Sequence, residues 1–370
     1  MAHFAESARS FARSCRGRLI WLAAAAGIVL LYFLLRPWTA GMDFLIRYVT
    51  TPWKRGMSWA CSLLPFSAAE LCWALLILGV PVFITLTAVQ IVRRKGGRLV
   101  LLFRRLSLLA AAAVSIYAGV CLLWGVNYYG KNFSDQSGLA AAPVSADQLE
   151  QAAVLFAGLV NESAGSVERD ENGLFCVSRE SILEDYYDLY DKIAEEYPFL
   201  GRNLPQPKLM FFSRLMSILD FTGFFFPFTG EANLNADSPA AFFPSTLAHE
   251  MAHQKNIAPE QEANFVAVVT CIRSGKPAYV YSGALLGYVH LANALYEADR
   301  ARWEAVSELL CAEARADLSA NNAYWAQFES PVSDAVQSVY SSFLQSNGQE
   351  LGMKSYGACV DLLVAYFTGG

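Results

Sequence analysis

The chain has 370 residues, of which 55% are hydrophobic and only 16% charged. An ordinary soluble domain carries about 25% charged residues, so this composition disfavours a simple cytosolic enzyme. Of the 28 basic residues, 14 lie before residue 126, whereas only three of the 33 acidic residues do. The net formal charge is therefore +11 for residues 1–125 and −16 for residues 126–370. This division indicates two parts in two environments, and the acidic second part argues against nucleic acid as a partner.

Three uncharged apolar runs, at residues 19–35, 71–92 and 106–125, predict membrane-spanning helices. Each is long enough to cross a hydrocarbon core of about 30 Å. Buried helices of a large soluble protein are the alternative, which the occurrence of three such runs together disfavours. The first run could also be a signal peptide, but no small-residue cleavage site follows it, so we expect an uncleaved anchor. Residues 1–125 are thus predicted to form a three-helix transmembrane module in the lipid bilayer.

The basic residues predict the orientation of this module. Four arginines precede the first run, and six Lys or Arg residues lie in the loop at 93–105. Positively charged flanks stay on the cytoplasmic side, so both segments are expected inside. The acidic C-terminal part is then expected outside the cytoplasm, and a cleaved first run would not change this result. We expect a multi-pass protein of the cytoplasmic membrane with an extracytoplasmic domain.

The rest of the chain predicts a mostly helical domain with a small β-sheet. Residues 126–147 are polar and rich in Gly and Ser, as in a linker, and the domain follows at 148–370. Its cysteines show no metal-binding spacing, so we expect buried thiols, with disulfides permitted by the location. The expected elements are a helix that begins at Ser145, a helix at 178–197, two short strands within 207–236, helices from Pro244 onward, and a terminal helix pair at 331–346 and 354–367.

The sharpest chemical signal is the HExxH motif formed by His249, Glu250 and His253. Four residues are about one helical turn, so the two histidines project from one face and can share a metal ion. Glu250 lies one step round the helix, where it can hold the water that reacts, and Ser245 is a plausible N-cap. Two ordinary helical histidines are a weaker alternative, and so is a structural zinc site, because such sites are rich in cysteine.

Two histidines leave a third protein ligand to be found. Pro259 is expected to start a new helix, with Glu260 and Glu262 in its first turn. These carboxylates lie about 200° apart around the helix axis, so only one can face the metal. Glu262 shares a face with Phe265, whereas Glu260 is expected to be solvated. The helix is apolar almost all round, so this argument alone leaves both residues open.

The segment PSTLAHEMAHQKNIAPEQEANFVAVV resembles the DUF3810 family of bacterial membrane proteins. The resemblance includes GEANLN before this segment, YSGALLGYV after it and the closing SYGACVDLLVAYF. The EAN-F element is also similar to the third-ligand helix of gluzincin-type zinc peptidases. This resemblance implies a zincin-like domain, zinc bound by His249, His253 and Glu262, and Glu250 as the general base.

The same resemblance implies two further roles. The strand at 230–235 would pair with an extended peptide substrate, although it could equally be a solvated turn and strand. Tyr281, or less favourably His290, would donate a hydrogen bond to the oxyanion, although either could belong to the core.

A membrane-anchored zinc metallopeptidase acting on peptides or proteins is therefore the leading prediction. A catalytically inactive sensor or scaffold that keeps the zinc site is the alternative. An intramembrane protease is disfavoured, because residues 236–262 carry five charged side chains.

Overall fold

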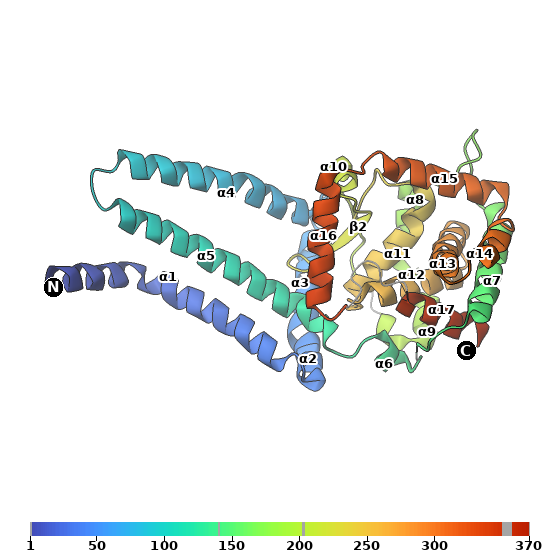
Figure 1. The fold of residues 1–370 in the computed structure, drawn as a ribbon, viewed down its shortest axis with the longest axis horizontal. Helices are drawn as coiled ribbons and strands as arrows, with labels where there is room; N and C mark the ends of the chain where they lie inside the picture. Colours follow the sequence, from blue (N-terminus) through green and yellow to red (C-terminus); the bar gives the residue numbers. More distant parts are fainter. Residues whose placement is uncertain (1, 140, 202–203, 350–356, 370) are drawn as a thin grey trace. The chain divides into compact units, whose positions relative to one another are not determined.

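The computed structural model describes residues 2–139, 141–201, 204–349 and 357–369. The chain forms two compact units, shown in Figure 1. The first unit comprises Met1–Trp53 and Ala68–Gly130, and the second comprises Lys54–Ser67 and Lys131–Gly370. The sequence suggested a single break near residue 125. The structure instead groups the short segment Lys54–Ser67 with the C-terminal unit.

The first unit contains the three predicted membrane spans. Helices long and apolar enough to cross a membrane occupy Arg16–Leu35, Ala68–Arg93 and Arg98–Leu123, which confirms the three predicted runs. The first and third of these helices pack against each other. The chain is therefore a membrane-anchored protein. The elements of this unit and of the connection to the second are α1 (Ala2–Leu35), α2 (Thr39–Leu45), a π-helical turn (Ile46–Thr50), α3 (Thr51–Ser62), α4 (Ala68–Arg93), α5 (Arg98–Leu123) and a 3-10 turn (Gly125–Tyr128).

The second unit is mostly helical, as predicted. Helices α11, α12 and α13 contact one another, and α7 and α17 also pack against α13. Its helices are α6 (Phe133–Ser137), α7 (Ala146–Ala164), α8 (Arg179–Glu184), α9 (Asp191–Glu196), α10 (Ser213–Ile218), α11 (Phe243–Gln254), α12 (Glu260–Ser274), α13 (Pro277–Ala298), α14 (Arg300–Ser307), α15 (Ala312–Ala326), α16 (Pro331–Ser346) and α17 (Gly357–Thr368), with 3-10 turns at Asp185–Tyr187, Pro198–Leu200 and Ala240–Phe242.

A three-stranded sheet accompanies these helices. Its strands are β1 (Lys208–Leu209), β2 (Gly223–Phe226) and β3 (Glu231–Leu234), in the order β1-β3-β2. Strand β3 pairs in parallel with β1 and antiparallel with β2. The two short strands predicted around the aromatic segment are therefore confirmed. Strand β3 is thus central, with β2 paired along its whole length and β1 paired at Asn233 and Leu234.

The hydrophobic core is centred on α12. The side chains of Phe265, Val266 and Val269 are fully buried, and so is the opposite face of the helix at Val268. A helix that is apolar on all sides is typical of the centre of a larger helical domain. The residues that begin this helix are consequently held by neighbours on every side.

Some helix boundaries agree with the sequence and others differ. Ser145 caps α7 through a capping box with Gln148, as its hydroxyl predicts. The helix predicted at 178–197 is instead divided into α8, a 3-10 turn and α9. At the break, the Ile182 carbonyl accepts a hydrogen bond from Tyr279, and Lys276 pairs with Asp185. These tertiary contacts compete with continuation of the helix. The predicted helix at 331–346 is α16, whereas residues 354–356 lie outside the described part.

The cysteines of the second unit are only partly as expected. Cys271 and Cys359 are buried, but Cys176 is exposed and Cys311 is half-buried. None of these four cysteines takes part in a disulfide in the described structure.

Candidate metal centre

Helix α11 presents the two histidines of the HExxH motif. Pro244 lies in its first turn, where the missing N–H costs nothing. Ser245, expected as the N-cap, lies inside the helix, because the helix starts two residues earlier. Leu247 and Met251 are buried in the core and fix the rotation of the helix. The rings of His249 and His253 then lie 4.6 Å apart between centroids, at 85° to each other.

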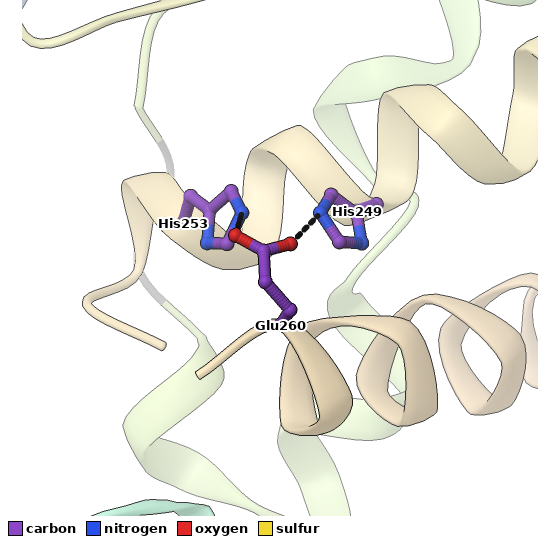
Figure 2. A group of neighbouring side chains, drawn as sticks. All are labelled: His249, His253 and Glu260. Atoms are coloured by element: carbon purple, nitrogen blue, oxygen red, sulfur yellow. Dashed lines mark ion pairs between the residues drawn. The ribbon is translucent and has the colours of Figure 1, made fainter. Parts of the chain in front are cut away.

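Glu260 completes a three-residue cluster with these histidines (Figure 2). Its two carboxylate oxygens lie 3.2 Å from His249 Nε2 and 3.6 Å from His253 Nε2. One donor atom from each of the three residues lies within 4.8 Å of the others. Two imidazole nitrogens and one carboxylate oxygen are a donor set that suits Zn²⁺. The residues present therefore fit a zinc ion.

The expectation that Glu262 faces the histidines is wrong. Its carboxylate accepts a hydrogen bond from the Phe133 N–H at 2.8 Å and a longer one from Ser134 N–H at 3.5 Å. These amides begin helix α6, where backbone donors lack partners within the helix. Both faces of α12 are buried, so hydrophobic packing did not distinguish the two carboxylates. Docking of α11 on one side and α6 on the other makes the distinction.

A tight turn connects the two helices of the cluster and orients His253. Asn256 has a φ of 74°, the left-handed conformation that Asn tolerates better than most residues. The turn brings the Ile257 carbonyl within 2.7 Å of His253 Nδ1. A carbonyl can only accept, so Nδ1 carries a proton, and in the neutral form of the ring Nε2 keeps its lone pair. This tautomer is the one that a ligand at Nε2 requires.

Glu260 is held in its charged form. Burial alone would raise its pKa, but the charge of His253 and hydrogen bonds from both histidines outweigh burial and hold the pKa well below its ordinary value. Tyr340 of α16 also donates a hydrogen bond to Glu260, at 2.7 Å. Tyr340 is a site residue that sequence reasoning missed, because it lies 80 residues away with no motif around it.

Glu250 lies beside the cluster and is almost completely buried. Burial raises its pKa to about 8, with the charge of His249 acting against this shift and that of Glu260 adding to it. Among the described residues, none donates a hydrogen bond to its Oε2 atom. Gly223 of β2 approaches it so closely that a Cβ there would lie 2.7 Å from Glu250 Oε1. The absence of a side chain at position 223 therefore makes room for this carboxyl.

Tyr281 is buried and is held by contacts with core residues. Its hydroxyl donates to Asp317 at 2.5 Å, its ring stacks on Phe175, and the Arg169 guanidinium lies over it. The structure thus shows Tyr281 in the core, the alternative that the sequence left open, with its hydroxyl already donating to Asp317. His290 is close enough to the cluster for the charge of His249 to affect it. Burial lowers its pKa to about 4, and the charge of His249 lowers it further.

Strand β3 does not have the role that its sequence suggested. The segment at 230–235 was expected to offer an edge to a peptide substrate, but β3 is the central strand and all four of its residues are buried. The edge strand on the side of Glu250 is β2, through Gly223. Strand order depends on tertiary pairing, which the local alternation of residues does not encode.

Residues from the segment Lys54–Ser67 also reach this region. Lys54 is 2% exposed and donates hydrogen bonds to the His253 carbonyl and to Asn256 Oδ1, and burial lowers its pKa to about 7. Ser67 donates to Asn233 of β3 at 2.6 Å. By sequence, this stretch is only the connection between the first two predicted spans. A lone lysine there resembles an ordinary flanking charge.

Comparison with known proteins identifies a family. No curated protein and no solved structure matches the chain. The family described as "Protein of unknown function (DUF3810)" matches residues 47–364, which include most of the predicted membrane module and the whole candidate metal centre. This match agrees with the resemblance noted in the sequence. The chain belongs to the DUF3810 family.

Proposed function

We propose that this protein is a membrane-anchored, zinc-dependent metallopeptidase. The observation that carries the proposal is the convergence of His249, His253 and Glu260, with the buried Glu250 beside them. The residues come from two helices and meet through tertiary packing, with donor atoms within 4.8 Å of one another. Three protein ligands of this type leave a further coordination position for water or substrate, which is typical of catalytic rather than structural zinc sites.

The residues divide the chemistry of peptide hydrolysis between them. His249, His253 and Glu260 would hold the ion, which when bound supplies a Lewis acid and lowers the pKa of water to near neutrality. Glu250 takes a proton from the attacking water as its oxygen adds to the peptide carbonyl carbon. As the C–N bond breaks, Glu250 passes this proton to the departing amine. A positive charge held by the three ligands would lower the pKa of Glu250 towards the range that a general base needs.

The surroundings of Glu250 support this assignment. The carboxyl is shielded from water, and the backbone of β2 approaches it closely at Gly223. In a water-poor site, electrostatic interactions with the reacting groups are stronger than in solution. His290 remains neutral at neutral pH, because burial and the charge of His249 lower its pKa to about 4.

We further propose that the second unit lies outside the cytoplasm. Residues 93–105, which include the connection between α4 and α5, contain the densest basic cluster of the chain, and such clusters remain on the cytoplasmic side. The chain crosses once more after this loop, through α5. The proposed substrates are therefore peptides or proteins at the outer face of the membrane.

The test compares purified full-length protein with its Glu250→Gln variant. We expect the variant to bind zinc as the wild type does but to release no new amino termini from a peptide library, because only the base is lost. Wild-type protein that binds zinc and cleaves no peptide would instead favour a sensor or scaffold. Equal cleavage by both proteins would remove Glu250 from the mechanism.

A further inference from the structure

The segment between the first two membrane helices contributes a buried lysine to the metal-site turn. Lys54 Nζ lies 3.1 Å from the carbonyl oxygen of His253 and 2.7 Å from Asn256 Oδ1. It also lies 4.4 Å from the centre of the Phe225 ring on β2. The Lys54 backbone packs against Gly230. A Cβ at position 230 would lie 2.5 Å from the Lys54 carbonyl oxygen. The lysine is thus enclosed by α11, β2 and the turn that joins β2 to β3.

We propose that Lys54 is a positioning residue for the metal centre, acting on the end of α11 and on the turn that holds His253. The proposal rests on the proposed metal site and adds to it a residue from outside the HExxH region. The hydrogen bonds of Lys54 described above go to the backbone of His253 and to the side chain of Asn256. Lys54 acts through the His253 carbonyl and the Asn256 side chain.

The first route is through the end of helix α11. The last carbonyls of a helix lack partners within the helix and carry partial negative charge. His253 lies in this last turn, and its carbonyl accepts a hydrogen bond from the Lys54 Nζ. A buried donor at this point satisfies the carbonyl and favours the helical conformation of a ligand residue.

The second route is through Asn256. Its φ of 74° costs energy for any residue with a Cβ, and the hydrogen bond from Lys54 to its side chain offsets part of that cost. The same turn places the Ile257 carbonyl on His253 Nδ1. Lys54 therefore stabilises the turn that selects the tautomer of His253 with Nε2 available to the metal.

A role in docking the segment alone is the competing explanation, and the chain offers a matched control. Lys208 is also largely buried and bonds the same segment, through the carbonyls of Cys61 and Phe66, to Glu231 on β3. In the described structure these contacts involve neither α11 nor the turn at 255–257. Replacing Lys208 weakens docking of the segment without touching the metal-site turn.

The experiment measures zinc affinity in full-length protein, purified in detergent and stripped of metal, by competition with a chelator. We expect Lys54→Met to weaken zinc binding about 10-fold to 100-fold, as loss of groups that orient metal ligands commonly does. Lys208→Met should stay within about 3-fold of the wild type. The Co²⁺-substituted protein provides a second readout. Its visible absorption spectrum should change in Lys54→Met, because the ligand geometry relaxes, and should persist in Lys208→Met.

A pair of variants at Asn256 covers the case in which Lys54→Met fails to fold. Glycine adopts the left-handed conformation freely but removes the Oδ1 acceptor of Lys54, so Asn256→Gly should weaken zinc binding by only a few-fold. Valine is strongly disfavoured there, so Asn256→Val should weaken zinc by about 10-fold or more.

Several outcomes would overturn the inference. Unchanged affinity in Lys54→Met would do so, as would an equal loss in Lys208→Met, which would show that docking of the segment accounts for the effect. Equal affinities of Asn256→Gly and Asn256→Val would remove the route through the turn. Failure of the wild-type protein to bind zinc is a separate result, because it would reject the metal site and with it the role of Lys54.

Discussion

Gly223 and Glu250 face each other so closely that a Cβ at position 223 would lie 2.7 Å from Glu250 Oε1 and 2.8 Å from Glu250 Cγ. The same Cβ would lie 3.0 Å from the Asn233 carbonyl oxygen of β3. The backbone of β3 therefore restricts movement of β2 away from Glu250. The position of the proposed general base is therefore set by a residue of β2 that has no side chain.

Gly223→Ala should consequently displace Glu250. We expect zinc binding to remain within a few-fold, peptide hydrolysis to fall at least about 10-fold, and stability to drop by about 1–3 kcal/mol through overpacking. Gly158→Ala is the control, since Gly158 lies within α7 and a Cβ there meets nothing within 4 Å. That control should be neutral or stabilising, because alanine is the better helix former. Gly223→Ala with wild-type activity and thermal stability would contradict the account of this contact.

The two carboxylates of α12 should separate clearly in metal binding. Glu260→Gln should weaken zinc by about 100-fold or more, because a neutral amide replaces a charged ligand that contacts both histidines. Glu262→Gln should stay within about 3-fold, because the amide oxygen still accepts from the Phe133 N–H. Chelator competition on the two full-length variants provides the measurement. A larger loss in Glu262→Gln would reverse the ligand assignment.

Truncation of Glu262 should instead affect stability. Glu262→Ala leaves the buried Phe133 N–H without its carboxylate acceptor, which costs about 1–3 kcal/mol. Thermal unfolding of the full chain in detergent should show the loss, and Glu171→Ala, at an exposed loop position, is the comparison. If Glu262→Ala and Glu171→Ala unfolded at the same temperature, the cap on α6 would contribute nothing to stability.

How far the sequence predicts the site depends on whether each relationship is local. The pairing of His249 with His253 follows from helical periodicity, so the motif alone predicts it correctly. The choice between Glu260 and Glu262 depends on which helices pack on either side of α12, and a helix buried all round carries no signal for that. Tyr340 and Lys54 reach the site only through the tertiary fold. Their sequence surroundings contain no pattern that indicates it.

The fold shows the same division. The three apolar spans and the cap at Ser145 are encoded in short stretches and are predicted well. Strand β3 was recognised as a strand, but its central place in the sheet is set by its long-range pairing with β1. The break between α8 and α9 likewise depends on Lys276 and Tyr279, about 90 residues further along the chain.

The proposed orientation can be tested with the exposed thiol of Cys176. A membrane-impermeant maleimide added to intact cells should label Cys176, because the second unit is proposed to lie outside. The Cys176→Ser variant is the background control. A double variant, Cys176→Ser with Lys95→Cys, places a cysteine in the loop between α4 and α5 and reports which side of the membrane that loop occupies. That cysteine should react only after the membrane is permeabilised. Labelling of Lys95→Cys in intact cells, with protection of Cys176, would invert the topology.

The central claim is a zinc site built by His249, His253 and Glu260, and metal analysis of the purified full-length protein tests it most directly. Elemental analysis should find one zinc ion per chain in the wild type. It should find little zinc in a variant in which both histidines are replaced by alanine, because the two nitrogen ligands are then lost. A wild-type protein without stoichiometric transition metal, or a double variant that retains its zinc, would contradict the account.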